Sequence, residues 1–183
     1  NVVFGDVVAL DALLDKGQLK EAEQLLGTLG KRGTSPVINL RRSRLLRYQD
    51  KAQEAVDSVD AALREGAPTQ RALVEAVYAL LAADNTASAR DLLTRYATVL
   101  GTNAEWLKAL VDFASNNPRR AKASVASLEA PPAEVSLLQR VLAARTLAAV
   151  GDRRAKDEIA ALLRTFSRNP DVTLAGKAVG LVR

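Results

Sequence analysis

The sequence predicts an all-α fold, and three features support that prediction. Alanine and leucine supply 33 and 28 of the 183 residues, whereas isoleucine supplies two and aromatic residues make up 4%. Alanine and leucine are strong helix formers, while β-branched and aromatic residues favour strands. Turn signals recur along the chain, and between them apolar residues recur at intervals of three and four, which is the spacing of one helix face. An all-β domain is therefore excluded.

A short pattern, in which a large aliphatic residue follows an alanine by four positions, occurs five times. The successive alanines are 33, 34, 32 and 34 residues apart, and each follows a turn signal. The five pairs are Ala22/Leu26, Ala55/Val59, Ala89/Leu93, Ala121/Val125 and Ala155/Ile159. Two helices approach closely only where a side chain is small, so we expect these alanines to be buried at helix–helix contacts. The period predicts one repeat domain over 1–183, with antiparallel helix pairs at about 3–34, 35–68, 69–101, 102–131 and 132–169 and an extra helix at 171–183.

Capping and turn residues set the expected helix boundaries in the first two units. Gly17 closes the first helix in a left-handed conformation, and the second helix begins at Leu19. Ser35 followed by Pro36 is an N-cap with proline at the first helical position. The expected helices of these units cover residues 4–16, 19–29, 36–48 and 51–64.

The later units carry similar signals. The third opens near Thr69, turns around Asn85 and continues to Val99. In the fourth, Thr102 and Glu105 have the spacing of a capping box, in which each side chain bonds to the other residue's backbone N–H. Further turns are expected at 116–118, 131–132, 151–152 and 169–170.

The repeat resembles the tetratricopeptide repeat family in a divergent form. That family has a 34-residue unit of two helices, and the stretch "KGQLKEAEQLLGTL" places five residues on its pattern: Gly17, Leu19, Ala22, Leu26 and Leu29. The small position of the first helix is degenerate, being Leu10, Ser43, Val77, Ala109 and Ala143 in the five units. The resemblance implies a right-handed α-solenoid that binds a partner protein or peptide on a concave surface lined by the first helices. Another helical-pair repeat type is the alternative.

On this register, arginine and tyrosine side chains gather on the concave surface. The candidate partner-binding residues are Arg44, Arg47, Tyr48, Arg71 and Tyr78. Arginine binds carboxylates in a bidentate geometry, and tyrosine offers an amphipathic face. This combination predicts capture of an acidic or C-terminal segment of a partner. The alternative is that Arg44 and Arg47 are ordinary solvated helix residues.

A second basic feature follows the repeat. Arg119, Arg120, Arg153 and Arg154 lie at the start of two second helices, and stacking would align them along one edge. This basic edge is either a solvated surface or a contact for a polyanion or acidic partner. The net charge of +5 is spread along the chain and only seven aromatic residues are present, so we do not expect nucleic-acid binding.

The missing residue types exclude much chemistry. Without Cys or His the chain has no thiol nucleophile, no imidazole base and no zinc-finger ligand set. Carboxylate pairs such as Glu21/Glu23 and Asp157/Glu158 are one or two residues apart and do not converge on one helix face, and no glycine-rich phosphate loop occurs. We therefore expect no enzymatic activity, no cofactor and no metal. The longest apolar run, 76–83, is too short to cross a membrane, and Trp106 is expected in the core.

The cellular context is predicted only by composition and resemblance. Alanine and arginine are abundant, as in GC-rich bacterial genomes, and tetratricopeptide-like segments of such bacteria often belong to envelope machines, including exopolysaccharide secretion. The resemblance therefore favours the periplasm over the cytoplasm. A helical accessory domain of an enzyme or transcription regulator is the alternative. The last helix has an apolar face, so we expect a fragment of a longer protein that pairs with a second copy through its C-terminal helix.

Overall fold

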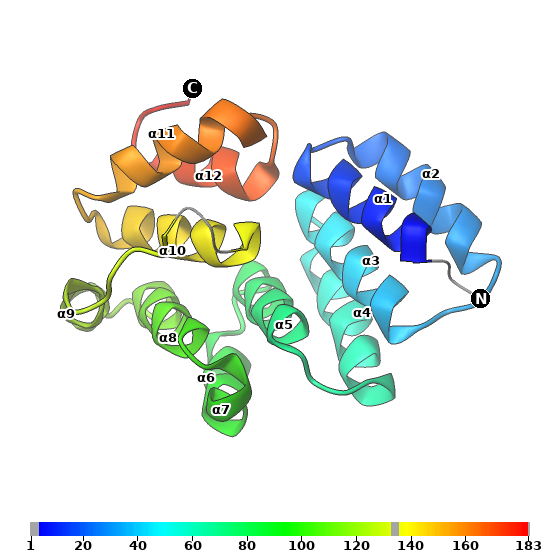
Figure 1. Ribbon diagram of the computed structural model, residues 1–183. Coiled ribbons are helices and arrows are strands. Elements are labelled where there is room, and N and C mark those ends of the chain that lie inside the picture. The colour runs from blue at the N-terminus through cyan, green and yellow to red at the C-terminus, as the bar shows by residue number, and fades with distance from the viewer. Residues whose placement is uncertain (1–3, 133–135, 183) are drawn as a thin grey trace. The chain divides into compact units, whose positions relative to one another are not determined.

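The computed structural model describes residues 4–132 and 136–182, and it places twelve helices and no strand in them (Figure 1). The predicted all-α class is confirmed. By its internal contacts the chain divides into two compact units, residues 1–85 and 86–183. The boundary falls inside the third predicted repeat, between its two helices. No helix in the described residues is long and apolar enough to cross a membrane.

From residue 4 onward, where its description begins, unit 1 has five helices, whose bounds lie within two residues of the predicted ones. They are α1 (Phe4–Asp15), α2 (Leu19–Gly30), α3 (Pro36–Tyr48), α4 (Ala52–Glu65) and α5 (Gln70–Ala82). Helix α3 packs against each of the other four. Leucine side chains from α1, α2 and α3 pack together in a buried hydrophobic core, among them Leu10, Leu26 and Leu45.

The turns of unit 1 form for the reasons that the sequence suggested. Gly17 has a φ of 66°, the left-handed conformation that glycine adopts without steric cost. The Ser35 hydroxyl accepts a hydrogen bond from the backbone N–H of Ile38 at 3.3 Å, and Pro36 is the first residue of α3. Both expectations are confirmed.

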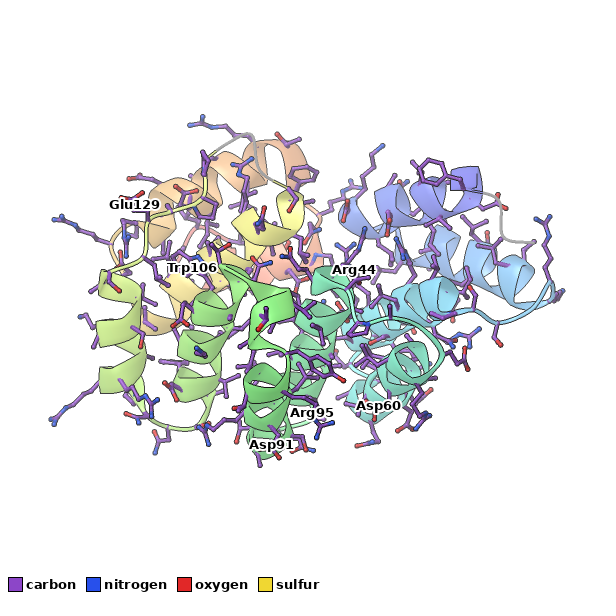
Figure 2. The ribbon with its side chains drawn as sticks, turned by 60° about the horizontal axis from the view of Figure 1, so that its bottom comes forward. Arg44, Asp60, Asp91, Arg95, Trp106 and Glu129 are labelled. Carbon is purple, nitrogen blue, oxygen red and sulfur yellow. The ribbon has the colours of Figure 1, made fainter. Side chains whose placement is uncertain are left out.

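The described residues of unit 2, 86–132 and 136–182, form seven helices: α6 (Thr86–Arg95), α7 (Ala97–Leu100), α8 (Asn103–Ala114), α9 (Pro118–Ala126), α10 (Leu137–Val150), α11 (Ala155–Phe166) and α12 (Pro170–Ala178). Helix α8 packs against α6, α9 and α10, and α10 packs in turn against α11 and α12. Trp106 of α8 is 5% exposed, so its predicted place in the core is confirmed (Figure 2).

The five alanines of the repeated pattern have no exposed surface at all. Their aliphatic partners are also buried, each with at most 4% of its surface exposed. The predicted burial of these alanines is confirmed at all five positions. The alanine pattern therefore marks positions in the helix packing of both units.

Three local predictions were wrong. The helix expected over 86–99 is interrupted at Tyr96, whose φ of −117° and ψ of 21° separate α6 from α7. Thr102 does not cap α8, because its backbone is already helical; Glu105 instead binds Lys108 at 2.6 Å. The last helix ends at Ala178 rather than continuing to residue 183, which lies outside the described residues.

The end of α12 has a clear physical cause. Gly180 has a φ of 74°, and the N–H groups of Leu181 and Val182 both bond to the carbonyl of Gly176. A left-handed glycine with such backward bonds is a common way to end a helix. Leu174 and Leu181 nevertheless stay 55% and 43% exposed, so part of the expected apolar face is present.

Candidate functional site

The predicted arginine-rich surface is a network of ion pairs on α1, α3 and α5. Three arginines of α3 and one of α5 meet two aspartates of α1 and one glutamate of α5. We call these seven residues the arginine cluster: Arg41, Arg44, Arg47, Arg71, Asp11, Asp15 and Glu75. All seven belong to unit 1.

Asp11 binds two guanidinium groups at once. Arg41 donates from Nε to Oδ1 at 3.1 Å and from Nη2 to Oδ2 at 2.7 Å. Arg71 donates from Nη2 to Oδ1 at 2.7 Å and from Nη1 to Oδ2 at 3.0 Å. Bidentate arginine–carboxylate pairs are the strong and geometrically specific ones. One carboxylate thus links α1 to both α3 and α5.

Arg44 lies one helical turn further along α3 and pairs with Asp15. Its Nη2 donates to Asp15 Oδ1 at 2.7 Å, and its Nε donates to the hydroxyl of Tyr48 at 2.8 Å. The Arg44 side chain is 15% exposed. Its charge is therefore held close to the surface in a fixed orientation.

Arg47 is the most enclosed member of the cluster. It donates from Nε and Nη2 to the two carboxylate oxygens of Glu75, at 3.0 and 3.1 Å. Its guanidinium also lies 4.8 Å from the ring centre of Tyr48 and 5.0 Å from that of Tyr78. Such cation–π contacts are stronger where water is excluded, as it is here: the Arg47 and Glu75 side chains are 7% and 8% exposed.

Arg71 is the most accessible arginine of the cluster, with 41% of its side chain exposed. Burial of the rest lowers the pKa of its guanidinium; Asp11 opposes this shift, and the charges of Arg41 and Arg44 add to it. The cluster holds four arginines and three carboxylates. Arg71 is thus the arginine of the cluster that solvent reaches most easily.

The structure brings together all five residues that the sequence proposed for partner binding. It does not leave them as a free groove, nor as solvated helix residues, because Arg44 and Arg47 are held in internal ion pairs and Tyr78 is 2% exposed. The sequence reading missed the three carboxylates. A signal for two of them existed, since Asp11 and Asp15 are four residues apart and so share one face of the first helix.

The residues of the predicted basic edge have different surroundings. Arg119 and Arg153 are exposed. Arg120 pairs with Asp112 of α8 at 3.0 Å. Arg154 turns inward and donates to two backbone carbonyls at the end of α9, those of Val125 at 3.1 Å and Leu128 at 2.6 Å.

Asp152 holds Arg154 in that position. Its Oδ1 accepts from Arg154 Nε, and its Oδ2 from Nη2, both at 2.9 Å. Hydrogen bonding from Arg154 lowers the pKa of the Asp152 carboxyl to about 2. Arg154 thus completes the C-terminal end of α9, where unpaired carbonyls need donors, and contributes little to a basic edge.

The described residues contain no group of three or more carboxylates that could hold a metal ion. Comparison of the chain with protein-family models, with curated proteins and with solved structures finds no match.

Proposed function

We propose that this chain is a non-enzymatic helical-repeat scaffold that binds an acidic segment of a partner protein on the arginine cluster. The observation that carries the proposal is the Arg71 guanidinium, which two hydrogen bonds to Asp11 hold in place while 41% of the side chain stays exposed. An incoming carboxylate would find a guanidinium whose orientation Asp11 already fixes. Preorganised donors reduce the entropy lost on binding, which favours affinity.

Within this proposal the cluster has two parts with different roles. Arg71, the exposed arginine, contacts the partner. Arg47, Glu75 and the Tyr78 ring lie beneath it and hold the surface in shape. Substitutions in the first part should weaken binding alone, whereas substitutions in the second should also destabilise the fold.

The repeated helix pair supports the scaffold role. The alternate helices α1, α3 and α5 pack on one another in chain order, and so do α8, α10 and α12. Neighbouring first helices of a tetratricopeptide-like solenoid line a common binding face. We propose that the two units are segments of such a solenoid, and that its place is in a bacterial envelope assembly.

The proposal is tested with a fluorescein-labelled hexaglutamate peptide and fluorescence anisotropy. Hexaglutamate should bind in preference to hexalysine. The variant Arg71→Gln should lower its affinity at least fivefold, because it removes the exposed charge. The matched control is Arg95→Gln on α6, an exposed arginine outside the cluster (Figure 2).

Two results would contradict the proposal. Equal affinity of the Arg71→Gln and wild-type proteins would show that the peptide binds elsewhere. An equal loss in Arg71→Gln and Arg95→Gln would show attraction to net charge rather than to this site. Melting temperatures of all three proteins should agree within a few degrees. Arg71 is partly solvated, and its substitution leaves the ion pair between Arg41 and Asp11 intact.

A further inference from the structure

Helix α1 turns an apolar face toward solvent. The structure describes this helix in full, and none of its exposed residues is charged: Phe4, Gly5, Val8, Ala9 and Ala12. Its three aspartates are instead partly buried. A surface helix normally has the reverse pattern, with polar residues outside and apolar residues toward the core. These five residues, which we call the α1 face, therefore form a surface of the kind that packs against another helix.

Small residues make the α1 face suitable for a close helix contact. Helices approach closely where side chains are small, and Gly5, Ala9 and Ala12 supply such positions. Outside the helix's own backbone, nothing lies within 4 Å of the place that a Cβ on Gly5 would take. Val8, in the middle of the face, is 50% exposed.

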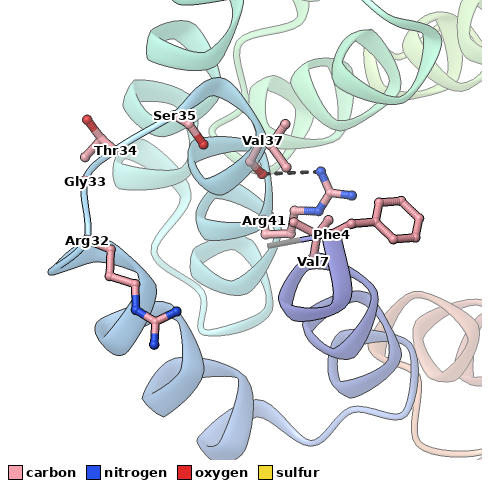
Figure 3. A pocket seen from close by; sticks show the side chains of 8 residues that line it. All are labelled: Phe4, Val7, Arg32, Gly33, Thr34, Ser35, Val37 and Arg41. Atoms are coloured by element: carbon pink, nitrogen blue, oxygen red, sulfur yellow. Dashed lines mark hydrogen bonds between the residues drawn. The ribbon is translucent and has the colours of Figure 1, made fainter. Parts of the chain in front are cut away.

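A pocket opens at one end of this face, between the start of α1 and the loop that joins α2 to α3 (Figure 3). Its volume is about 620 Å³, and its apolar lining is formed by Phe4, Val7 and Val37. Phe4 and Val37 are 82% and 42% exposed. The Phe4 ring points away from the loop at residues 32–35 (Figure 3). A large aliphatic side chain of a partner can therefore pack between these groups.

Helix α12 has an exposed apolar face of its own. Leu174 is 55% exposed, and Ala178, one turn later, is exposed too. Leu181, in the tail that follows, is 43% exposed. The exposed charge of this helix is Lys177, since Asp171 is buried. We call Leu174, Lys177, Ala178 and Leu181 the α12 face.

The packing inside each unit indicates what these two faces fit. Helix α3 packs against both α1 and α5, and α10 packs against both α8 and α12. The structure describes α3 and α10 in full: Val37 is the one exposed residue of α3, and α10 has none. A helix of this series is thus covered when it has a neighbour of the series on each side. The α1 and α12 faces are the sides on which such a neighbour would pack.

We propose that copies of this chain associate head to tail, with the α12 face of one copy on the α1 face of the next. The contact would continue the packing of α10 on α12 by one more helix. Leu174 would fill the pocket beside Phe4, and Lys177 would lie near Asp6, whose side chain is 32% exposed. Two α1 faces brought together would instead place Asp6 of each copy near the other. Neither face includes a residue of the arginine cluster, so this inference does not depend on the proposed function.

A contact between two different faces has a distinctive consequence. Each copy that binds through one face keeps the other face for a further copy, so assembly continues until a ring closes. A contact between two identical faces stops at a dimer. The dependence of mass on concentration therefore distinguishes the two arrangements.

The test is sedimentation velocity of the full chain at rising protein concentration. The weight-average mass of the wild type should increase beyond that of a dimer. Val8→Asp on the α1 face and Leu174→Asp on the α12 face should each weaken association at least tenfold, because each places a charge in an apolar contact. Val99→Asp, at an exposed valine of α7 outside both faces, should leave association unchanged. Circular dichroism checks that each variant is folded, and Ala12→Asp replaces Val8→Asp if that variant unfolds.

Mixing the two variants tests the head-to-tail arrangement directly. Val8→Asp keeps an intact α12 face, and Leu174→Asp keeps an intact α1 face. An equimolar mixture should therefore form a dimer with one copy of each variant. It should grow no further, since the two faces that remain both carry the new aspartate.

Four results would overturn the proposal. A wild-type protein that stays monomeric at every concentration would show that the faces do not associate. Weakening by Val8→Asp alone would assign association to pairs of α1 faces, and weakening by Leu174→Asp alone would assign it to pairs of α12 faces. A mixture of the two variants that stays monomeric would show that the α1 and α12 faces do not meet.

Discussion

The guanidinium of Arg71 donates two hydrogen bonds, of 2.7 and 3.0 Å, to the carboxylate of Asp11, which lies 60 residues earlier in the chain. The same carboxylate binds Arg41, so the Asp11 side chain joins α1 to both α3 and α5. This arrangement stiffens unit 1 and orients the exposed arginine that we propose as the contact with a partner.

The role of Asp11 predicts a large effect on stability. Asp11→Ala leaves two arginines without their partner in a partly buried site, so it should lower the free energy of unfolding by about 3 kcal/mol. Asp60→Ala, at an exposed position of α4 (Figure 2), should change it by less than about 0.5 kcal/mol. Urea unfolding followed by circular dichroism measures both. Equal stability of the two variants would show that the arginine cluster does not hold the helices together.

The alanine pattern predicts which small residues cannot be enlarged. Ala89 is 0% exposed, so Ala89→Leu should overpack the site and cost about 1–3 kcal/mol. Ala87, two residues earlier on α6, is exposed and should accept leucine at little cost. Thermal unfolding of the two variants makes the comparison. If Ala89→Leu is as stable as Ala87→Leu, the alanine does not mark a close helix contact.

The pair of Asp152 and Arg154 predicts a dependence of stability on pH. The carboxyl pKa falls from 3.8 to about 2 on folding, so the folded state binds this proton more weakly. The pair's stabilisation is therefore complete above pH 3.8 and is lost as the pH falls through about 2. Asp152→Asn should flatten the stability profile between these values. The measurement is urea unfolding from pH 2 to 5, and parallel profiles for the two proteins would contradict it.

The tail after α12 predicts an interaction between two substitutions. A Cβ placed on Gly176 would lie 2.7 Å from Val182 Cγ2, so Gly176→Ala alone should displace the tail. With Val182→Ala present, the same change should stabilise the helix by about 0.5–1 kcal/mol, because alanine is the better helix former. A double-mutant cycle in thermal unfolding measures the coupling. Additive effects would mean that Val182 does not pack on Gly176.

Local features of the fold were predictable because they depend on few neighbouring residues. The Ser35 cap, the Gly17 turn and the buried alanines are of this kind. The predicted capping box at Thr102 does not form, because the backbone of Thr102 is already helical. The chain turns one residue earlier, at Gly101, which has a φ of 55°. The spacing of Thr102 and Glu105 does not indicate the backbone conformation with which the chain enters the helix.

The candidate site was predictable in part. The spacing of Arg44 and Arg47 placed them on one helix face with Tyr48, and the structure agrees. Their carboxylate partners are 29 and 28 residues away on other helices, and the register between helices is set by core packing. The sequence therefore identified the basic side chains and missed that most of their charge is neutralised within the fold.

The most direct test of the central claim is an NMR titration of the arginine side chains with hexaglutamate. The Nε–H signal of each arginine reports on its own surroundings. We expect the signal of Arg71 to shift in a saturable way, while those of Arg119 and Arg153 on the predicted basic edge do not. Shifts confined to Arg119 and Arg153, or no saturable shift at Arg71, would contradict the claim that the arginine cluster binds acidic segments.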